Sequence, residues 1–326
     1  MQSKSKKLFK HIAIVSALAV SLPSFALTVK GYNHAHKGKV AVERSVKLKP
    51  SGKGFAVADT RVAARPGDRI RVQDVTPGAN GIDYNGGPIM SGNTNVYYIW
   101  YGDWSSNTKA QQVLVNFMSS IGGTPLYNVN TTYYDNTNAY VANQVTLAGQ
   151  ANDSYSQGTS LDDNAVLAVV QNAISNGAVP LDPNASYMVL TSPDVNETSG
   201  FGSQYCGWHN HATVSGTDVK YAFIGNPTQI APDTCGVNNP SPNGDGGADA
   251  MASVIFHELS ETVSDPDITA WFDSTGAENG DKCAWNWGTT YTAANGSTAN
   301  QNIGGSDWLL QQMWLNANGG QCAQSY

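Results

Sequence analysis

Apolar and polar residues follow one another along the chain in patterns that predict both strands and helices. The range Asn95–Tyr101 is a continuous β-branched and aromatic run between two glycines, which predicts a buried strand. In the range Thr108–Ile121 apolar residues recur at helical spacing, and a pair of glycines ends the pattern. These segments predict a strand followed by an amphipathic helix.

Weaker patterns predict the remaining elements. Residues 126–134 and 139–148 alternate between apolar and polar side chains, which predicts two paired strands. Short apolar runs predict strands at 187–190 and 221–224, and helical spacing predicts helices at about 160–177, 249–263 and 307–315. Since strands and helices mix without strict β-α-β alternation, we expect one α+β domain over 81–326, with a mixed sheet and packed helices.

The first 26 residues have the order of a secretory signal peptide. Four lysines precede an apolar run over residues 12–22, and small residues stand three and one positions before an expected cut after Ala26. A membrane-spanning helix needs about 20 apolar residues, so this run is too short to be an anchor. No later segment is long and apolar enough either, and we expect a secreted protein without a membrane span.

Charge divides the rest of the chain into a basic arm and an acidic body. Residues 27–71 hold eleven Lys and Arg against three acidic residues, whereas residues 72–326 hold three Lys against 22 acidic residues. With few aromatic residues and scattered Gly and Pro, the arm, 27–80, is expected to be a flexible linker or a pro-segment that covers the acidic body. The acidic body argues against binding to nucleic acid or to an anionic surface.

All four cysteines lie in the C-terminal part of the chain. An even number of cysteines in an exported protein predicts two disulfides, for which three pairings exist. We favour Cys206–Cys235 and Cys283–Cys322, because each of these bonds closes a local loop. The chain has no C-x-x-C pair, so a zinc site built from thiolates is not expected.

One predicted helix carries residues that can bind a metal ion and activate water. His257 and Glu261 are four residues apart, so a helix places both side chains on one face. This spacing resembles the H-E-x-x-H motif of zinc peptidases, with Glu261 in place of the second histidine. In that motif the glutamate after the first histidine is the general base, which assigns Glu258 to that role. The turn at 245–249 is expected to begin this helix.

Glutamate is rare in the acidic body and gathers around this helix. Residues 72–326 contain four glutamates, of which three fall in the range Glu258–Glu278. In zinc peptidases of the thermolysin type a third ligand follows at a similar distance, so Glu278 is the expected third ligand, with Asp281 as a supporting group. Asp265 could join the site. Zinc is the expected ion, and calcium is the alternative because the predicted ligands are rich in oxygen.

Two further histidines lie upstream in a Cys-Gly-Trp-His-Asn-His segment. His209 and His211 are two residues apart, so on an extended loop both side chains point to the same side. They could complete the metal site. They could equally be exposed polar rings in a loop tied by a disulfide, and the sequence leaves both interpretations open.

Several motifs follow one another in order between residues 85 and 322. They are Gly87–Trp104, Cys206–His209, Tyr221–Pro227, Pro242–Met251, His257–Pro266, Ala270–Trp271 and Glu278–Cys283. Together they resemble the phosphate-induced protein 1 family, also called the EXORDIUM family, of plants and some bacteria. The resemblance implies an extracellular or cell-wall protein, and no catalytic activity is firmly attached to the family.

Three hypotheses of function follow. The first is a secreted metal-dependent hydrolase, a zincin-like metallopeptidase in which metal-bound water attacks an extracellular protein or cell-wall substrate. The second is a non-catalytic extracellular or cell-wall binding protein with a structural metal ion. The third is a carbohydrate-binding or carbohydrate-active protein with a tryptophan-rich surface, formed by Trp100, Trp104, Trp208, Trp271, Trp285 and Trp287.

Overall fold

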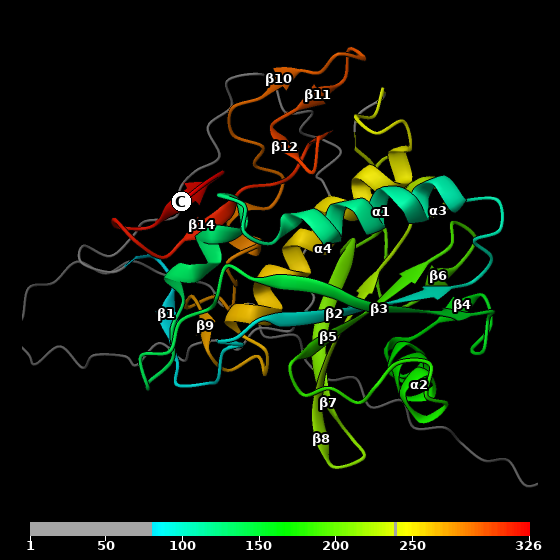
Figure 1. The fold of residues 1–326 in the computed structure, drawn as a ribbon, viewed down its shortest axis with the longest axis horizontal. Helices are drawn as coiled ribbons and strands as arrows, with labels where there is room; N and C mark the ends of the chain where they lie inside the picture. Colours follow the sequence, from blue (N-terminus) through cyan, green and yellow to red (C-terminus); the bar gives the residue numbers. More distant parts are fainter. Residues whose placement is uncertain (1–79, 238–239) are drawn as a thin grey trace, which may run out of the picture. The chain divides into compact units, whose positions relative to one another are not determined.

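A computed structural model describes residues 80–237 and 240–326 (Figure 1). The predicted signal peptide, 1–26, and the predicted basic arm up to residue 79 lie outside the described residues. Within the described ranges, no helix combines the length and the apolar character that a bilayer crossing requires.

A mixed sheet of five strands forms the centre of the domain. Its order is β3 (Val145–Asp153), β2 (Thr94–Tyr101), β5 (Ala185–Thr191), β8 (Thr217–Ile224) and β7 (Gly207–Val214). The first four strands are parallel, and β7 pairs antiparallel with β8, which follows it in the chain as the second arm of a hairpin. Because β5 lies in the middle of the sheet and both its faces are covered, every residue of this strand is buried.

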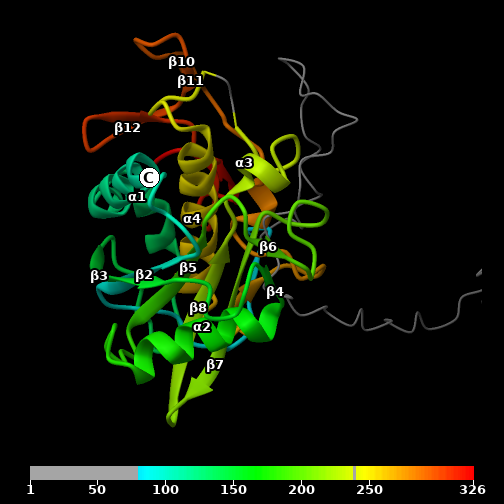
Figure 2. The ribbon, with the colours of Figure 1, turned by 90° about the vertical axis from the view of Figure 1, so that its right-hand side faces the viewer.

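Helices cover both faces of this sheet. Figures 1 and 2 show α1 (Thr108–Ile121) and α4 (Gly246–Ser264) on one face and α2 (Asp163–Ser175) on the other. The helix α1 buries one apolar stripe, whereas α4 is buried on every side from Gly247 to Ser264. Polar side chains near the middle of α4 are therefore shielded from solvent.

Short elements complete the described chain. Two-stranded antiparallel pairs are β1–β9 (Asp83–Tyr84, Trp271–Phe272), β10–β11 (Tyr291–Thr292, Thr298–Ala299), β12–β13 (Gln301–Ile303, Ser306–Trp308) and β14–β15 (Met313–Leu315, Gln321–Ala323). The strands β4 (Ser160–Leu161) and β6 (Asn196–Glu197) pair in parallel. The remaining helices are η1 (Tyr127–Thr132), α3 (Pro227–Ile230) and η2 (Asp281–Cys283).

Much of the predicted organisation is confirmed. The helix expected over Thr108–Ile121 has these bounds, and Asp162 begins α2 by accepting a hydrogen bond from the backbone N–H of Ala165. Asp245 does the same for α4 through the N–H of Ala248. The result is a single α+β domain with a mixed sheet, as expected.

Three segments differ from the predicted secondary structure. Most of the range 126–134 is η1 (Tyr127–Thr132) rather than a strand, because the Thr124 hydroxyl accepts the backbone N–H of Tyr127 at 3.1 Å and starts a helical turn. Of the predicted pairing, a single antiparallel bridge between Tyr134 and Tyr140 is present. The strand expected at 139–148 begins only at residue 145, and its partner is the distant β2. The helix expected at 307–315 is instead parts of two hairpins. Gly304 and Gly305 have φ of 62° and 77°, which suits a tight two-residue hairpin turn before this segment.

Most of the tryptophans expected to form a surface are buried. Trp100, Trp104, Trp208 and Trp271 are buried in the core, so these four rings are not available for ligand stacking. Large aromatic side chains contribute much of the buried apolar area of a domain, and that is their place here.

Both favoured disulfides are present. Cys206–Cys235 fixes the residue that precedes β7 to the loop after α3, and Cys283–Cys322 joins η2 to β15.

Candidate metal centre

The predicted helix motif lies in the second half of α4, where the helix is buried on all sides. His257 and Glu261 are one turn apart on the same face, and His257 Nε2 lies 2.9 Å from Glu261 Oε1. Neither side chain is exposed to solvent. The helix thus brings the two side chains together, as the spacing predicts, and their role as metal ligands stays a prediction.

Two other elements bring a second histidine and two carboxylates to this pair. His209 extends from β7, and its Nε2 lies 3.2 Å from Glu278 Oε2 and 3.6 Å from Glu261 Oε2. Asp281 opens η2, and its Oδ1 lies 3.7 Å from His257 Nε2. We call these five residues, His209, His257, Glu261, Glu278 and Asp281, the Glu261 cluster.

The Glu261 cluster contains two overlapping groups whose donor atoms are close enough to hold one ion each. One triad is His209, Glu261 and Glu278, and the other is His257, Glu261 and Asp281, with all donor atoms of each triad within 4.8 Å of one another. In a tetrahedral zinc site, bonds of about 2.0–2.1 Å put neighbouring ligand atoms roughly 3.3 Å apart. The four distances between a histidine nitrogen and a carboxylate oxygen, from 2.9 to 3.7 Å, lie close to that value.

Buried oxygen atoms of this cluster lack hydrogen bonds. Glu261 Oε2 and Glu278 Oε1 are fully buried and have no hydrogen-bond partner in the described part of the chain. His209 Nδ1 is buried and unbonded in the same way. Buried polar atoms in folded proteins are normally satisfied, and buried carboxylates normally have a cation or several donors beside them. A bound cation would compensate the charge of both carboxylates.

Gln311 sets the orientation of the His257 ring. Its side-chain nitrogen donates to the carbonyl oxygens of Gly280 and Gln312 at 3.1 and 3.3 Å, so its Oε1 is the atom that faces His257 Nδ1 at 3.2 Å. Nδ1 must then carry the proton and donate it, and Nε2 faces the carboxylates of the cluster. Metal-binding histidines are commonly oriented by such a hydrogen bond on the other ring nitrogen.

Burial and mutual repulsion change the pKa values of the carboxylates. Burial raises the pKa of Glu278 well above its ordinary range, and the charge of Glu261 adds to that effect. Burial, with Glu261 beside it, also raises the pKa of Asp281 to about 7. Without an ion, these two groups therefore retain protons at pH values where exposed carboxylates are ionised.

The two histidines of the cluster respond in opposite directions. Burial lowers the pKa of His209 to about 4, which leaves the ring neutral and able to bind a metal ion. Burial acts in the same direction on His257, but the carboxylates of Glu261 and Glu258 outweigh it and raise its pKa to about 10. In the absence of an ion, His257 is thus the positive partner of Glu261.

Gly280 allows the turn that carries Glu278 and Asp281 to approach α4. A Cβ atom on Gly280 would lie 2.8 Å from His257 Nδ1 and 2.9 Å from Glu261 Oε1, which no side chain tolerates. The backbone N–H of Asp281 donates to Glu261 Oε1 at 3.1 Å and closes the contact. Two residues after Asp281, Cys283 is held by its disulfide to Cys322.

Other residues named from the sequence lie outside both triads. Asp265 ends α4, and its Oδ1 accepts the backbone N–H groups of Thr269 and Ala270 at 2.6 and 2.5 Å. Glu258 is fully buried, and its Oε1 lies 3.0 Å from the position that a Cβ on Gly207 would occupy. Its proposed role as general base remains a prediction.

His211 belongs to a separate group near the surface. Its Nδ1 lies 2.9 Å from Asp218 Oδ1 and 3.9 Å from Asp267 Oδ1. The ammonium of Lys220 pairs with Asp218 and lies 3.2 Å from Asp267 Oδ1, so a cation already compensates these carboxylates. Of the two histidines, the structure brings only His209 into the Glu261 cluster.

Comparisons with known proteins agree with the motifs. A model of the phosphate-induced protein 1 conserved region matches residues 82–323. Protein EXORDIUM-like 5 of Arabidopsis thaliana is 32% identical over 272 residues, which cover 71% of this chain and 74% of that protein. Protein EXORDIUM-like 3 of the same plant is 30% identical over 268 residues, covering 71% and 79%. Protein EXORDIUM is 30% identical over 217 residues, covering 57% and 66%. The chain therefore belongs to the phosphate-induced protein 1 family.

Proposed function

We propose that this protein is a non-catalytic extracellular binding protein whose fold is stabilised by a divalent metal ion, zinc, at the Glu261 cluster. The observation that carries the proposal is the burial of histidine and carboxylate donors from three separate elements around one glutamate. The helix α4, the strand β7 and the turn before η2 each contribute donors. A bound ion would join them, as structural metals do in other folds.

Burial of the cluster favours a structural role over a catalytic one, because each triad has three donors and substrate would have to reach the position that they leave open. Structural zinc sites are closed, whereas catalytic sites keep one coordination position open for water and substrate. His257 and Glu261 have no exposed side-chain surface, and His209 and Glu278 have at most 1%. Asp281 is the member with appreciable exposure, at 20% of its side chain. Glu258 is buried as well, and a general base must reach water and substrate.

The donor types favour zinc over calcium. Calcium binds six to eight oxygen atoms at about 2.3–2.6 Å, and imidazole nitrogen is a poor ligand for it. Each triad of the Glu261 cluster offers one imidazole nitrogen with carboxylate oxygens, which suits zinc. His209 shifts the choice of ion from calcium towards zinc, because with His257 it doubles the number of nitrogen donors in the cluster.

The disulfides support an extracellular location. Both bonds close within the domain and leave no free cysteine among the described residues. Disulfides of this kind form and persist in oxidising compartments, in agreement with the predicted signal peptide.

Thermal unfolding of the purified protein, with zinc and after chelation, tests this function. Chelation removes a ligand that binds only the native state, so we expect the melting temperature to fall by about 5–10 °C for an ion present at 100 times its Kd. Zinc should restore it. The variant Glu258→Gln should keep the response to chelation, because Glu258 lies outside the two triads.

The hydrolase hypothesis makes the opposite prediction for the same variant. If metal-bound water attacks a substrate, the wild-type protein will hydrolyse at least one member of a peptide and ester panel, and Glu258→Gln will abolish that activity. Zinc-dependent hydrolysis lost in this variant would replace the structural role by a catalytic one. An unchanged melting temperature after complete removal of zinc would contradict the structural role directly.

A further inference from the structure

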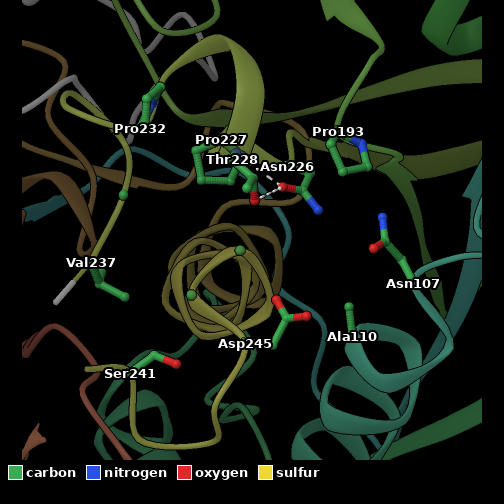
Figure 3. Close-up of a pocket in the computed structure, with 13 residues that line it drawn as sticks. Asn107, Ala110, Pro193, Asn226, Pro227, Thr228, Pro232, Val237, Ser241 and Asp245 are labelled. Carbon is green, nitrogen blue, oxygen red and sulfur yellow. Dashed lines mark hydrogen bonds between the residues drawn. The ribbon is translucent and has the colours of Figure 1, made fainter. Parts of the chain in front are cut away.

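A pocket of about 420 Å³ lies at the start of α4, at a different place from the Glu261 cluster (Figure 3). Its walls come from the beginning of α4, the beginning of α1 and the segment that leads into α3. Asn226, Asn107 and Asp245 bring polar groups to it, and Pro193 and Pro227 add apolar surface. A volume of this size is typical of sites for small molecules.

Asn226 points an unpaired donor into this pocket. Its Oδ1 accepts the backbone N–H of Thr228 at 3.1 Å and the Thr228 hydroxyl at 2.6 Å. A backbone N–H can only donate, so the atom bonded to it must be the amide oxygen and the other atom must be Nδ2. Figure 3 shows Nδ2 directed into the open space between α4 and α1. The residue is only 2% exposed, and its hydrogen bonds with other described residues involve the backbone N–H and Oδ1 but not Nδ2.

Two further polar groups face the same space. Asn107 occupies the position before α1, but its side chain makes no capping hydrogen bond and turns toward the pocket in Figure 3. Asp245 caps α4 with Oδ1, which accepts the N–H of Ala248 at 2.9 Å. Its second carboxylate oxygen remains available on the pocket side. Gly246 follows, and a Cβ there would meet no atom within 4 Å, so the pocket is open beside it.

This combination of groups favours neither sign of ligand charge. The Asp245 carboxylate and the positive end of the α4 dipole act in opposite directions on a charged ligand, so their effects offset each other. Amide donors beside a carboxylate acceptor match groups that both accept and donate, which are hydroxyls. The proline rings offer apolar surface to carbon-bound hydrogens between such hydroxyls. The required ligand is neutral, small and rich in hydroxyl groups.

We propose that this pocket binds one neutral saccharide unit through Asn226, Asn107 and Asp245. The inference deepens the proposed binding function by naming a site and a ligand class. It does not involve the Glu261 cluster, so the binding of sugar and the content of metal can be measured separately on the same protein. A free sugar and a terminal unit of a polysaccharide share this chemistry.

Ligand-observed NMR titration of the whole protein tests the inference. The probes are glucose, galactose, mannose, xylose and their disaccharides, with glucose 6-phosphate and glucuronate as charged comparators. We expect at least one neutral sugar to bind more tightly than its charged counterpart. Co-sedimentation with insoluble neutral polysaccharides then distinguishes a polymer-bound unit from a free sugar, and either source agrees with the proposal.

Three variants locate the binding. Asn226→Asp keeps the oxygen that accepts from Thr228 and removes the donor, so affinity should fall at least tenfold. Asn107→Ala removes an amide without a capping role and should also weaken binding at least tenfold in a protein of unchanged stability. Asn152→Ala, on the exposed side of β3, is the matched control and should bind like the wild type.

Three results would overturn the proposal. They are the absence of binding by every neutral sugar, tighter binding of the charged comparators, and full affinity in both Asn226→Asp and Asn107→Ala. Metal content should remain the same in all variants, so a failure here does not bear on the metal centre.

Discussion

At the scale of single residues, Glu261 is the side chain that both triads share. Its Oε1 faces His257 and Asp281, and its Oε2 faces His209. An ion in either triad would therefore be bound by Glu261. The Glu261 side chain has no exposed surface, so water cannot compensate the charge of its carboxylate.

Gln311 provides a prediction at this scale. Gln311→Leu keeps a similar volume but removes the acceptor that fixes the His257 ring, and we expect zinc affinity to fall about 10–100-fold. Competition with a chromogenic chelator measures this affinity. Gln171→Leu, at an exposed position of α2, is the control and should bind zinc like the wild type. Equal zinc affinities in the two variants would contradict a role of Gln311 in orienting His257.

At the scale of elements, the cluster depends on how closely the turn before η2 approaches α4. Two disulfides brace the two non-helical contributors, since Cys206 precedes β7 and Cys283 ends η2. The helix α4 provides the third contributor. It is buried along almost its whole length and is also held by hydrogen bonds, such as those of Ser260 with Asn130 and Asn279.

Gly280→Ala tests this approach. The added methyl group would lie 2.8 Å from His257 Nδ1, so the turn must move away from the helix. We expect a loss of about 1–3 kcal/mol in unfolding free energy together with weaker zinc binding. Gly92→Ala is the matched control, because a Cβ at Gly92 meets no atom within 4 Å. Chemical denaturation and chelator competition measure both effects, and wild-type behaviour of Gly280→Ala would contradict the close packing.

The elements also show how far the sequence could predict this site. His257 and Glu261 were predictable, because helical spacing alone places them on one face. For His209 the sequence left two interpretations open, a metal ligand or an exposed ring, since its approach to Glu261 depends on the pairing of β7 with β8. Gln311 could not be predicted, because it lies in a segment expected to be a helix and is extended between two hairpins.

At the scale of the whole molecule, the Glu261 cluster links stability to pH. Burial raises the pKa of Asp281 from 3.8 to about 7, and nearby carboxylates raise that of His257 from 6.5 to about 10. Between the ordinary pKa of each group and its raised pKa in the native state, the metal-free native protein holds a proton that the unfolded chain has lost. Below pH 6.5 the lowered pKa of His209 acts in the opposite direction and offsets the effect of Asp281. Stability of the metal-free protein should therefore decrease as pH rises from about 6.5 to about 10, the window set by His257.

Zinc should reverse this trend, because it displaces the protons that the cluster otherwise retains. Melting temperatures with zinc and with chelator, measured between about pH 5 and pH 8, check the prediction. The gap between the two curves should widen as pH rises. A gap that narrows over this range would contradict the assignment of these groups as ligands.

The whole domain thus combines the fold of its family with a buried centre that unites α4, β7 and the η2 turn. Elemental analysis of the purified protein by plasma mass spectrometry tests this centre most directly, beside Glu261→Gln and the control Glu197→Gln. Glu197 is also a buried glutamate, but its carboxylate accepts from Tyr205, Ser199 and Phe201 in a different part of the domain. We predict stoichiometric zinc in the wild type and in Glu197→Gln, and its loss in Glu261→Gln. A wild-type protein free of metal, or a Glu261→Gln variant that retains its zinc, would contradict the metal centre.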